Sequence, residues 1–314
     1  MTTQETLITP ADGALFEAEP RLGRQRGLWS DAWRRLIRNR LALAAMAILA
    51  VIVFLSFIGT TYGPTARFEP NDQQPAIKFQ GPSAEHWFGT DNLGRDLFAR
   101  VLEGVRISIQ IGLGTQALVL VIGLAIGAGA ALGGKLSDNL LMRFTDIMYA
   151  FPDLLAIILV RSILVGRDIP VLTNPKVIVI MAIAFVNWTT IARLVRGQML
   201  SLAERDYVLA ARALGANRWR IVYTHMLPNT LGPVIVALTF GIPFAIFAEA
   251  ALSFVGVGTP PPAISLGILV STGYDVVQRN AWNVVFPAGA VALLMLCFTF
   301  LGDGLRDALD PRTR

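Results

Sequence analysis

The stretch YVLAARALGANRWRIVYTHMLP, residues 207–228, links two long uncharged runs, 177–192 and 226–248. It is polar and rich in helix-forming residues, whereas the runs that it links are almost wholly apolar. Helices in a bundle are usually joined by roughly 2–8 residues, and the polar connection here is about 30 residues long. We therefore expect this segment to contact something beyond the two runs that it joins.

The composition is that of a membrane protein. Of 314 residues, 54% are hydrophobic and 16% are charged, against roughly 25% charged in soluble domains. About 20 apolar residues cross a bilayer core, and a sixth apolar segment, 147–160, is interrupted by Asp153. The sequence therefore predicts an all-α integral membrane protein with six transmembrane helices, not a soluble enzyme. The uncharged runs are 41–66, 107–134, 177–192, 226–248 and 280–302, of which 177–192 is marginal in length.

The distribution of Lys and Arg predicts the orientation. With the N-terminus inside, the expected inner segments hold 18 basic residues and the outer segments hold 9. Because basic residues favour the cytoplasmic side, an N-in and C-in topology is expected. Arg34, Arg35, Arg38 and Arg40 stand directly before the first run, where they are expected to contact lipid headgroups. That run is too long for the apolar part of a signal peptide, so we expect it to remain as an anchor.

The segment after the first run contains a helical pattern. Leu97, Val101, Leu102 and Val105 fall at helical spacing and predict an amphipathic helix on the outer surface. The predicted organisation is a cytoplasmic tail at 1–40, a first transmembrane helix at 41–62, an external segment at 63–106, a membrane core at 107–302 that includes the cytoplasmic loop 201–227, and a cytoplasmic tail at 303–314.

Small residues and prolines indicate how the spans pack. The run 107–134 contains Gly123-Leu-Ala-Ile-Gly127 and Gly129-Ala-Ala-Leu-Gly133, patterns that let transmembrane helices approach closely. The run 226–248 contains Pro233, Gly241 and Pro243, which predict a bend in that span.

Capping signals give the cytoplasmic loop a shape. Ser201-Leu-Ala-Glu204 fits a capping box, so a helix is predicted to begin there. Gly215 suits the left-handed residue that ends a helix, and Asn217 is placed to begin a second helix over 218–226. Pro228 then suits the first turn of the next span. The prediction is a helix–glycine–helix elbow that docks into a partner; the alternative is an amphipathic pair resting on lipid headgroups.

This elbow resembles the coupling loop of the membrane subunits of ABC importers. The loop's pattern is Glu-Ala-Ala, three residues, Gly, nine residues and Ile-x-Leu-Pro. Here Ala210, Ala211, Gly215, Leu227 and Pro228 match it. Two positions differ, because leucine replaces the glutamate at 209 and histidine replaces the isoleucine at 225. The leucine removes any polar contact that the glutamate makes.

Further segments are similar to the dipeptide/oligopeptide/nickel permease family, specifically its C-type subunit. They are GTDNLGRDLFARVLEGVRISI (89–109), MRFTDIMYAFPDLL (142–155), EAALSFVGVGTPPP (249–262) and LGDGLRDALDPR (301–312). The resemblance implies an ABC importer type I permease fold, with a five-helix core plus one N-terminal helix, in a bacterial or archaeal plasma membrane. It implies ATPase coupling through the loop residues Glu204, Tyr207, Leu209, Ala210, Ala211, Leu214 and Gly215.

The same resemblance implies the partners and the substrate class. A C-type subunit pairs with a B-type permease, two ABC ATPase subunits and an external solute-binding protein, and imports peptides by alternating access. Nickel chelates, glutathione and oligosaccharides are the alternative solutes. No nucleic-acid partner is expected.

The sequence offers no site for ATP in this chain. Residues 129–135 approximate a P-loop, but Leu136 stands where the Mg-binding Ser or Thr is needed, and the motif ends a membrane run. ATP and Mg are therefore expected in the separate ATPase subunits, with no cofactor or metal here and no enzymatic activity. His86 and His225 are expected on opposite sides of the membrane, and the single cysteine, Cys297, is expected to serve packing.

Five charged residues are candidates for transport roles. Asp153 and Glu249 lie in membrane runs, where an unpaired charge facing lipid costs about 2.5–3.5 kcal/mol. They are expected either to line the translocation pathway or to make structural hydrogen bonds. Asp91, Arg95 and Asp96, outside the membrane, either receive the binding protein or form local salt bridges and caps. A less favoured reading, an ion-coupled secondary transporter, usually brings internal repeats, and we find none in the sequence.

Overall fold

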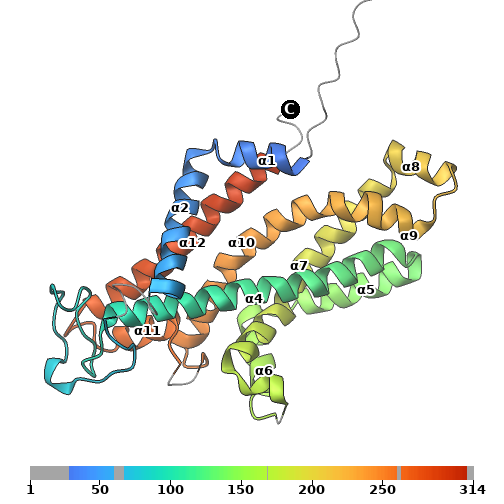
Figure 1. Cartoon of the computed structure of the whole chain (residues 1–314). Helices are drawn as coiled ribbons and strands as arrows, with labels where there is room; N and C mark the ends of the chain where they lie inside the picture. The colour runs from blue at the N-terminus through green and yellow to red at the C-terminus, as the bar shows by residue number, and fades with distance from the viewer. Residues whose placement is uncertain (1–27, 60–66, 168, 260–262, 310–314) are drawn as a thin grey trace, which may run out of the picture.

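The computed structural model describes residues 28–59, 67–167, 169–259 and 263–309 (Figure 1). Helices carry the fold, and the described residues form no β-sheet. The parts of the predicted termini, first span and 249–262 motif that fall in the remaining residues lie outside this description. The main helices are α1 (Leu28–Leu36), α2 (Arg40–Phe54), α4 (Leu97–Leu132), α5 (Lys135–Tyr149), α6 (Asp153–Leu164), α7 (Pro175–Ala203), α8 (Asp206–Ala213), α9 (Arg218–Ile221), α10 (Leu227–Phe254), α11 (Leu266–Tyr274) and α12 (Trp282–Leu309).

Five helical segments of the described chain are long and apolar enough to cross a bilayer. The sixth predicted span corresponds to a bent pair of helices, because α5 and α6 meet at an angle of 97°. By length and composition the structure therefore has five spans, or six when the bent pair counts as one. The five segments are Arg40–Gly59, Leu97–Leu132, Pro175–Ala203, Arg218–Phe254 and Trp282–Leu309.

The break between α5 and α6 has a local cause. Pro152 is extended, with φ −60° and ψ 121°, and a proline lacks the N–H that a continuing helix needs. The residue before a proline is also biased away from the helical region. The sequence predicts Asp153 inside a span, but the structure places it in the first turn of α6. There a carboxylate is favoured by the partial positive charge of the helix start.

The predicted amphipathic surface helix is not a separate element. Its residues form the first turns of α4, a 36-residue helix that is about 54 Å long at 1.5 Å per residue. Leu97, Val101, Leu102 and Val105 are all buried, three of them in one cluster with residues of α10, α11 and α12. The apolar face was therefore identified correctly, but it packs inside the protein because α10 to α12 cover it.

Helices α4 and α7 pack closely through the glycines of α4. A Cβ at Gly123 would lie 2.7 Å from Ile191 Cγ2, and one at Gly127 would lie 2.8 Å from Val195 Cβ. Side chains at these two positions would push the helices apart. The sequence predicts close packing at the first small-residue pattern, within the subunit or against a partner, and the structure shows that the contact is within this subunit.

Helix α10 occupies the middle of the bundle and continues through Pro233 and Pro243 without an interruption of the helix. The two prolines of α10 therefore do not interrupt this span, whereas Pro152 separates α5 from α6. Gly241 has a packing role instead, because a Cβ there would lie 2.6 Å from Cδ of Gln116 on α4.

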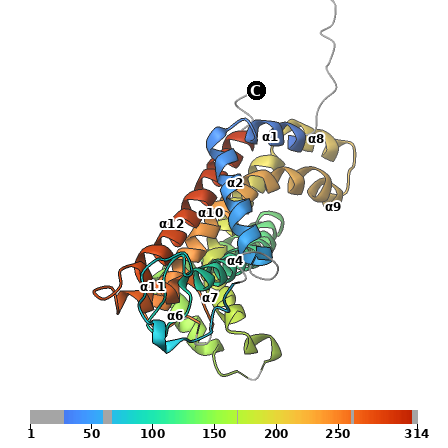
Figure 2. The ribbon, with the colours of Figure 1, turned by 60° about the vertical axis from the view of Figure 1, so that its left-hand side comes forward.

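The two ends of the bundle carry different elements. Helices α1 and α8 and the C-terminal end of α12 lie at one end, and α6, α11 and residues 67–96 lie at the other (Figures 1 and 2). Helix α1 packs on α12, where Leu36 and Ala308 are buried together. The predicted C-terminal tail at 303–314 begins inside α12, which extends to Leu309. Cys297 is buried in the bundle core, in agreement with its predicted packing role.

Candidate functional site

The candidate site is the connection between α7 and α10, residues 204–226, which we call the elbow. The structure contradicts the predicted capping box, because Ser201 belongs to the last turn of α7 and Glu204 is its C-cap residue. The next helix, α8, begins one turn later, after Arg205, without a side-chain cap. Burial of Met199 in the bundle core stabilises the longer α7 and overrides the local capping signal.

The end of α8 is a Schellman motif, and it confirms the predicted stop at Gly215. The backbone of Gly215 is left-handed, with φ +80°, a conformation that glycine adopts without steric cost. Its N–H donates to the carbonyl of Arg212 at 3.0 Å, and the N–H of Ala216 donates to the carbonyl of Ala211 at 3.0 Å. These two bonds satisfy carbonyls that the helix end leaves free.

The second arm of the elbow begins at Asn217, as predicted. The side-chain oxygen of Asn217 accepts a hydrogen bond from the N–H of Trp219 at 3.1 Å. The predicted end at residue 226 coincides with the end of a π-helical segment, Val222–Met226, and Pro228 lies in the first turn of α10 as predicted. No turn separates these elements, because α9 continues through the π-helical segment directly into α10. This arm is therefore the beginning of one long span, Arg218–Phe254. The π-helical segment lies just before Pro228, which has no N–H for a regular helix.

The base of the elbow is fixed to the membrane helices. Val208 of α8 has no exposed surface, and Ile221, Val222 and Met226 of the second arm are also buried. All four belong to one apolar cluster with residues of α4 and α7, including Val119 and Met199. The elbow is therefore packed onto the ends of two spans rather than tethered loosely to them.

The tip of the elbow exposes large apolar side chains. Leu214 is 88% exposed, Trp219 is 61% exposed and Tyr223 is 64% exposed. The rings of Trp219 and Tyr223 stack with their centroids 6.1 Å apart. A cluster of exposed apolar and aromatic side chains marks a contact surface.

Most of the predicted coupling residues have exposed side chains. Glu204, Tyr207, Leu209, Ala210, Leu214 and Gly215 are exposed, and Ala211 is half-buried. Sequence reasoning missed Trp219 and Tyr223. Their signal was present, since two aromatic residues stand four positions apart at the start of a capped helix and share one helix face.

The two membrane carboxylates occupy different environments. Asp153 is exposed at the start of α6, beside the bend. Glu249 has no exposed surface, and the Ser253 hydroxyl donates to its Oε1 at 2.8 Å. Glu249 therefore packs inside the chain, close to Ser108 of α4 and Ser265 before α11.

The three charged residues near the other end of the bundle hold their own loop together. Asp91 pairs with Arg95 at 2.7 Å, and its second oxygen accepts the backbone N–H groups of Leu93 and Arg95. Asp96 caps α4 by accepting from the N–H of Ala99 at 2.7 Å, and it bonds His86 Nδ1 at 2.8 Å. Both carboxylates are buried. The local pairs and caps that the sequence allowed are therefore present.

Two solved transporters resemble the arrangement of helices. The chain is similar to an inward-facing structure of the MetNI methionine ABC transporter, with a TM-score of 0.54 and 21% identity, over 67% of this chain and 96% of that chain. It is also similar to an amino acid ABC transporter, with a TM-score of 0.51 and 18% identity, over 65% of this chain and 91% of that chain. These similarities show the fold of an ABC importer permease.

Curated relatives match almost the whole chain. The oligopeptide transport system permease protein OppC of Bacillus subtilis is 37% identical, over 99% of this chain and 98% of the relative. The dipeptide transport system permease protein DppC of Alkalihalophilus pseudofirmus is 39% identical, over 91% and 90%. The OppC protein of Haemophilus influenzae is 38% identical, over 92% and 90%.

Two family models match in sequence order. Residues 27–82 match the N-terminal TM domain of oligopeptide transport permease C. Residues 120–314 match the binding-protein-dependent transport system inner membrane component. The chain therefore belongs to the family of inner-membrane components of binding-protein-dependent transport systems, as a multi-pass transport subunit.

Proposed function

We propose that this chain is one of two permease subunits that together form the translocation pathway of an ATP-driven peptide importer. One observation carries the proposal: the elbow has a base buried against α4 and α7 and a tip of exposed apolar side chains, among them Leu214 and Trp219. Such a tip suits insertion into a groove of an ATPase subunit. ATP and Mg bind in the two ATPase subunits, and this chain needs no cofactor of its own.

The elbow passes movement of the ATPases to the spans. When the ATPases close around ATP, the tip moves with them, and its buried base carries α4 and α7 along. The pathway then alternates between inward-open and outward-open states, and hydrolysis resets the cycle. Each ligand shifts this equilibrium only by its difference in affinity for the two states. Leu209 and its apolar neighbours make docking depend on shape more than on charge.

Peptides are the proposed substrates, because the relatives of this chain are named oligopeptide and dipeptide transport permeases. Asp153 is the proposed pathway residue of this chain, since it is exposed at the bend between α5 and α6. A carboxylate there attracts the amino group of an incoming peptide. Uptake of nickel chelates, glutathione or oligosaccharides in place of peptides would overturn this substrate assignment without affecting ATP-driven import.

The remaining partners occupy other faces. Exposed apolar side chains on α5 and α6, among them Leu136, Leu140 and Leu155, suit contact with the B-type permease of the heterodimer. The external binding protein is proposed to dock at the opposite end of the bundle from the elbow, on the loop shaped by Asp91, Arg95 and Asp96. The carboxylates of Asp91 and Asp96 already bond to groups within the loop. Docking there is therefore proposed to depend on the shape of the loop.

The decisive experiment removes the aromatic tip and leaves the bundle intact. Trp219→Ala and Tyr223→Ala, in the complete importer with its two ATPases and binding protein, are each expected to weaken ATPase association about tenfold or more, since a buried aromatic at an interface is worth about 2 kcal/mol. Substrate-stimulated ATP hydrolysis and peptide uptake into proteoliposomes fall in parallel.

Matched controls come from exposed aromatic residues elsewhere. Trp33 of α1 is 58% exposed and Tyr274 of α11 is 60% exposed. Their alanine variants are expected to retain ATPase association. Equal losses in the controls, or unchanged association in the tip variants, would contradict the coupling role. Peptide uptake that persists after ATP depletion with the proton gradient intact would instead indicate an ion-coupled transporter.

A further inference from the structure

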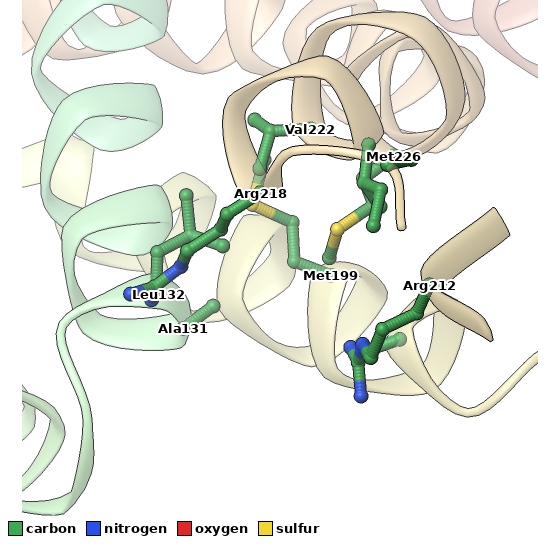
Figure 3. Close-up of a pocket in the computed structure, with 10 residues that line it drawn as sticks. Ala131, Leu132, Met199, Arg212, Arg218, Val222 and Met226 are labelled. Atoms are coloured by element: carbon green, nitrogen blue, oxygen red, sulfur yellow. The ribbon is translucent and has the colours of Figure 1, made fainter. Parts of the chain in front are cut away.

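A cavity of about 410 Å³ lies beneath the elbow (Figure 3). Its walls come from four parts of the chain: the last turn of α4, the last turns of α7, α8, and the second arm of the elbow. Ala131, Leu132, Met199 and Met226 make much of the surface apolar. A cavity of this size is large enough to receive part of an acyl chain, since ligand pockets span roughly 300–1,000 Å³.

Two arginines give the cavity a charge. Arg212 of α8 and Arg218 of α9 both line it, and Figure 3 shows them on either side of Met199 and Met226. Neither guanidinium has an ion-pair or hydrogen-bond partner within the described residues, and the lining contains no acidic side chain. By contrast, Arg193 and Arg196 on the adjoining part of α7 pair with Asp146 and Asp138. The two cavity arginines are thus free to bind an external anion.

The position of the cavity favours a lipid as that anion. Ala131 and Leu132 lie at the end of the uncharged run 107–134, so the apolar wall of the cavity belongs to the end of a candidate membrane span. The cytoplasmic leaflet carries anionic lipids, and basic pockets between transmembrane helices on that side bind their headgroups. The inference rests on the proposed function for one point only, the placement of the elbow on the cytoplasmic side.

We propose that the cavity beneath the elbow binds one anionic phospholipid of the cytoplasmic leaflet. Arg212 and Arg218 supply the positive charge that attracts the phosphate, and one acyl chain enters between Met199, Met226 and the end of α4. Because the two arginines come from the two arms of the elbow, the bound lipid bridges these arms. Lipid composition then affects how firmly the tip is presented to the ATPase.

The test measures lipid binding to the full-length chain, purified in mild detergent, with fluorescent phosphatidylglycerol as the probe. Replacement of both arginines by Gln is expected to weaken binding about 30-fold, from about 1 kcal/mol for each basic residue. Arg205→Gln with Arg220→Gln is the matched control, because both residues are exposed on the elbow and neither lines the cavity. This control is expected to change binding less than about threefold.

Further measurements distinguish binding of a lipid from binding of a simple anion and from misfolding of the variants. Inorganic phosphate at millimolar concentration is expected not to displace the probe, whereas unlabelled phosphatidylglycerol displaces it and phosphatidylcholine does not. Ala203→Phe, which fills the cavity without a change of charge, is expected to weaken binding, with an unchanged unfolding temperature. Displacement by phosphate, equal loss in the control pair, or full binding by the Ala203→Phe variant would each overturn the proposal. The measurement needs no ATPase, so failure of ATPase docking would refute the proposed function and leave this result standing.

Discussion

The left-handed residue at the corner of the elbow is the most informative position to change. A non-glycine residue at φ +80° costs about 1–2 kcal/mol, and a β-branched residue is a steric outlier there. No atom outside its own backbone neighbourhood lies within 4 Å of a Cβ built on Gly215, so the penalty is conformational and involves no clash. If the cap opens instead, its two hydrogen bonds are lost, at about 0.5–1.5 kcal/mol each.

Gly215→Val is therefore expected to destabilise the native elbow by about 2 kcal/mol, which is roughly a 30-fold shift toward other conformations. The base of the elbow is buried separately, so the protein still inserts and keeps its bundle. The assay is substrate-stimulated ATP hydrolysis by the assembled importer. Stimulation is expected to fall in the order Asn, Ala, Val at position 215, because Asn tolerates the left-handed region best.

The same substitution elsewhere provides the control. Gly232 in α10 also has open space around its missing Cβ, but its φ does not lie in the left-handed region. Gly232→Val is expected to leave stimulation unchanged, since valine is at least as good as glycine within a helix. Normal stimulated hydrolysis with valine at 215, or an equal loss with valine at 232, would refute the reasoning.

Three further comparisons test the bundle. Gly127→Ala places a methyl group 2.8 Å from a valine of α7 and is expected to cost about 1–3 kcal/mol in unfolding free energy, whereas Gly129→Ala, whose nearest contact is 3.4 Å, is nearly neutral by thermal unfolding. Asp96→Ala removes the α4 cap and the partner of a buried histidine; a loss of about 1–3 kcal/mol is expected, and Asp96→Asn restores part of it. Asp138→Ala breaks a partly exposed pair with Arg196, so the loss is at most about 1 kcal/mol, and a larger fall at physiological salt would contradict the weight given to exposed pairs.

Hydropathy was sufficient for most of the spans, because uncharged runs of this length have few alternatives in a bilayer. Residue chemistry that acts on the backbone was also readable: Gly215 and Asn217 form the predicted caps with their immediate neighbours. The close helix contact at Gly127 could also be predicted, because it depends on the absence of a side chain at that position. Such signals need no knowledge of which other helix lies nearby.

Predictions failed where distant contacts decided the outcome. The capping box at Ser201 is chemically sound, yet α7 continues past it because Met199 is buried against other helices. The sequence predicts that the face beginning at Leu97 lies on the outer surface, since the sequence alone does not reveal that α10 to α12 cover it. At Asp153 the break was readable from Pro152, but the length needed to cross a bilayer favoured one continuous span.

The apolar side chains of the elbow form a buried set and an exposed set. This division bears on the two interpretations of the elbow, which are docking into a partner and resting on lipid headgroups. A pair of helices resting on lipid headgroups needs one apolar face. Here Val208 and Ile221 are already buried against α4 and α7, while Leu214 and Trp219, on either side of Gly215, remain exposed. The buried set fixes the elbow to α4 and α7, which are in close contact at Gly123 and Gly127. We therefore expect the exposed set to contact a second partner, and displacement of the tip to be passed to α4 and α7 through the packed contacts of the buried set.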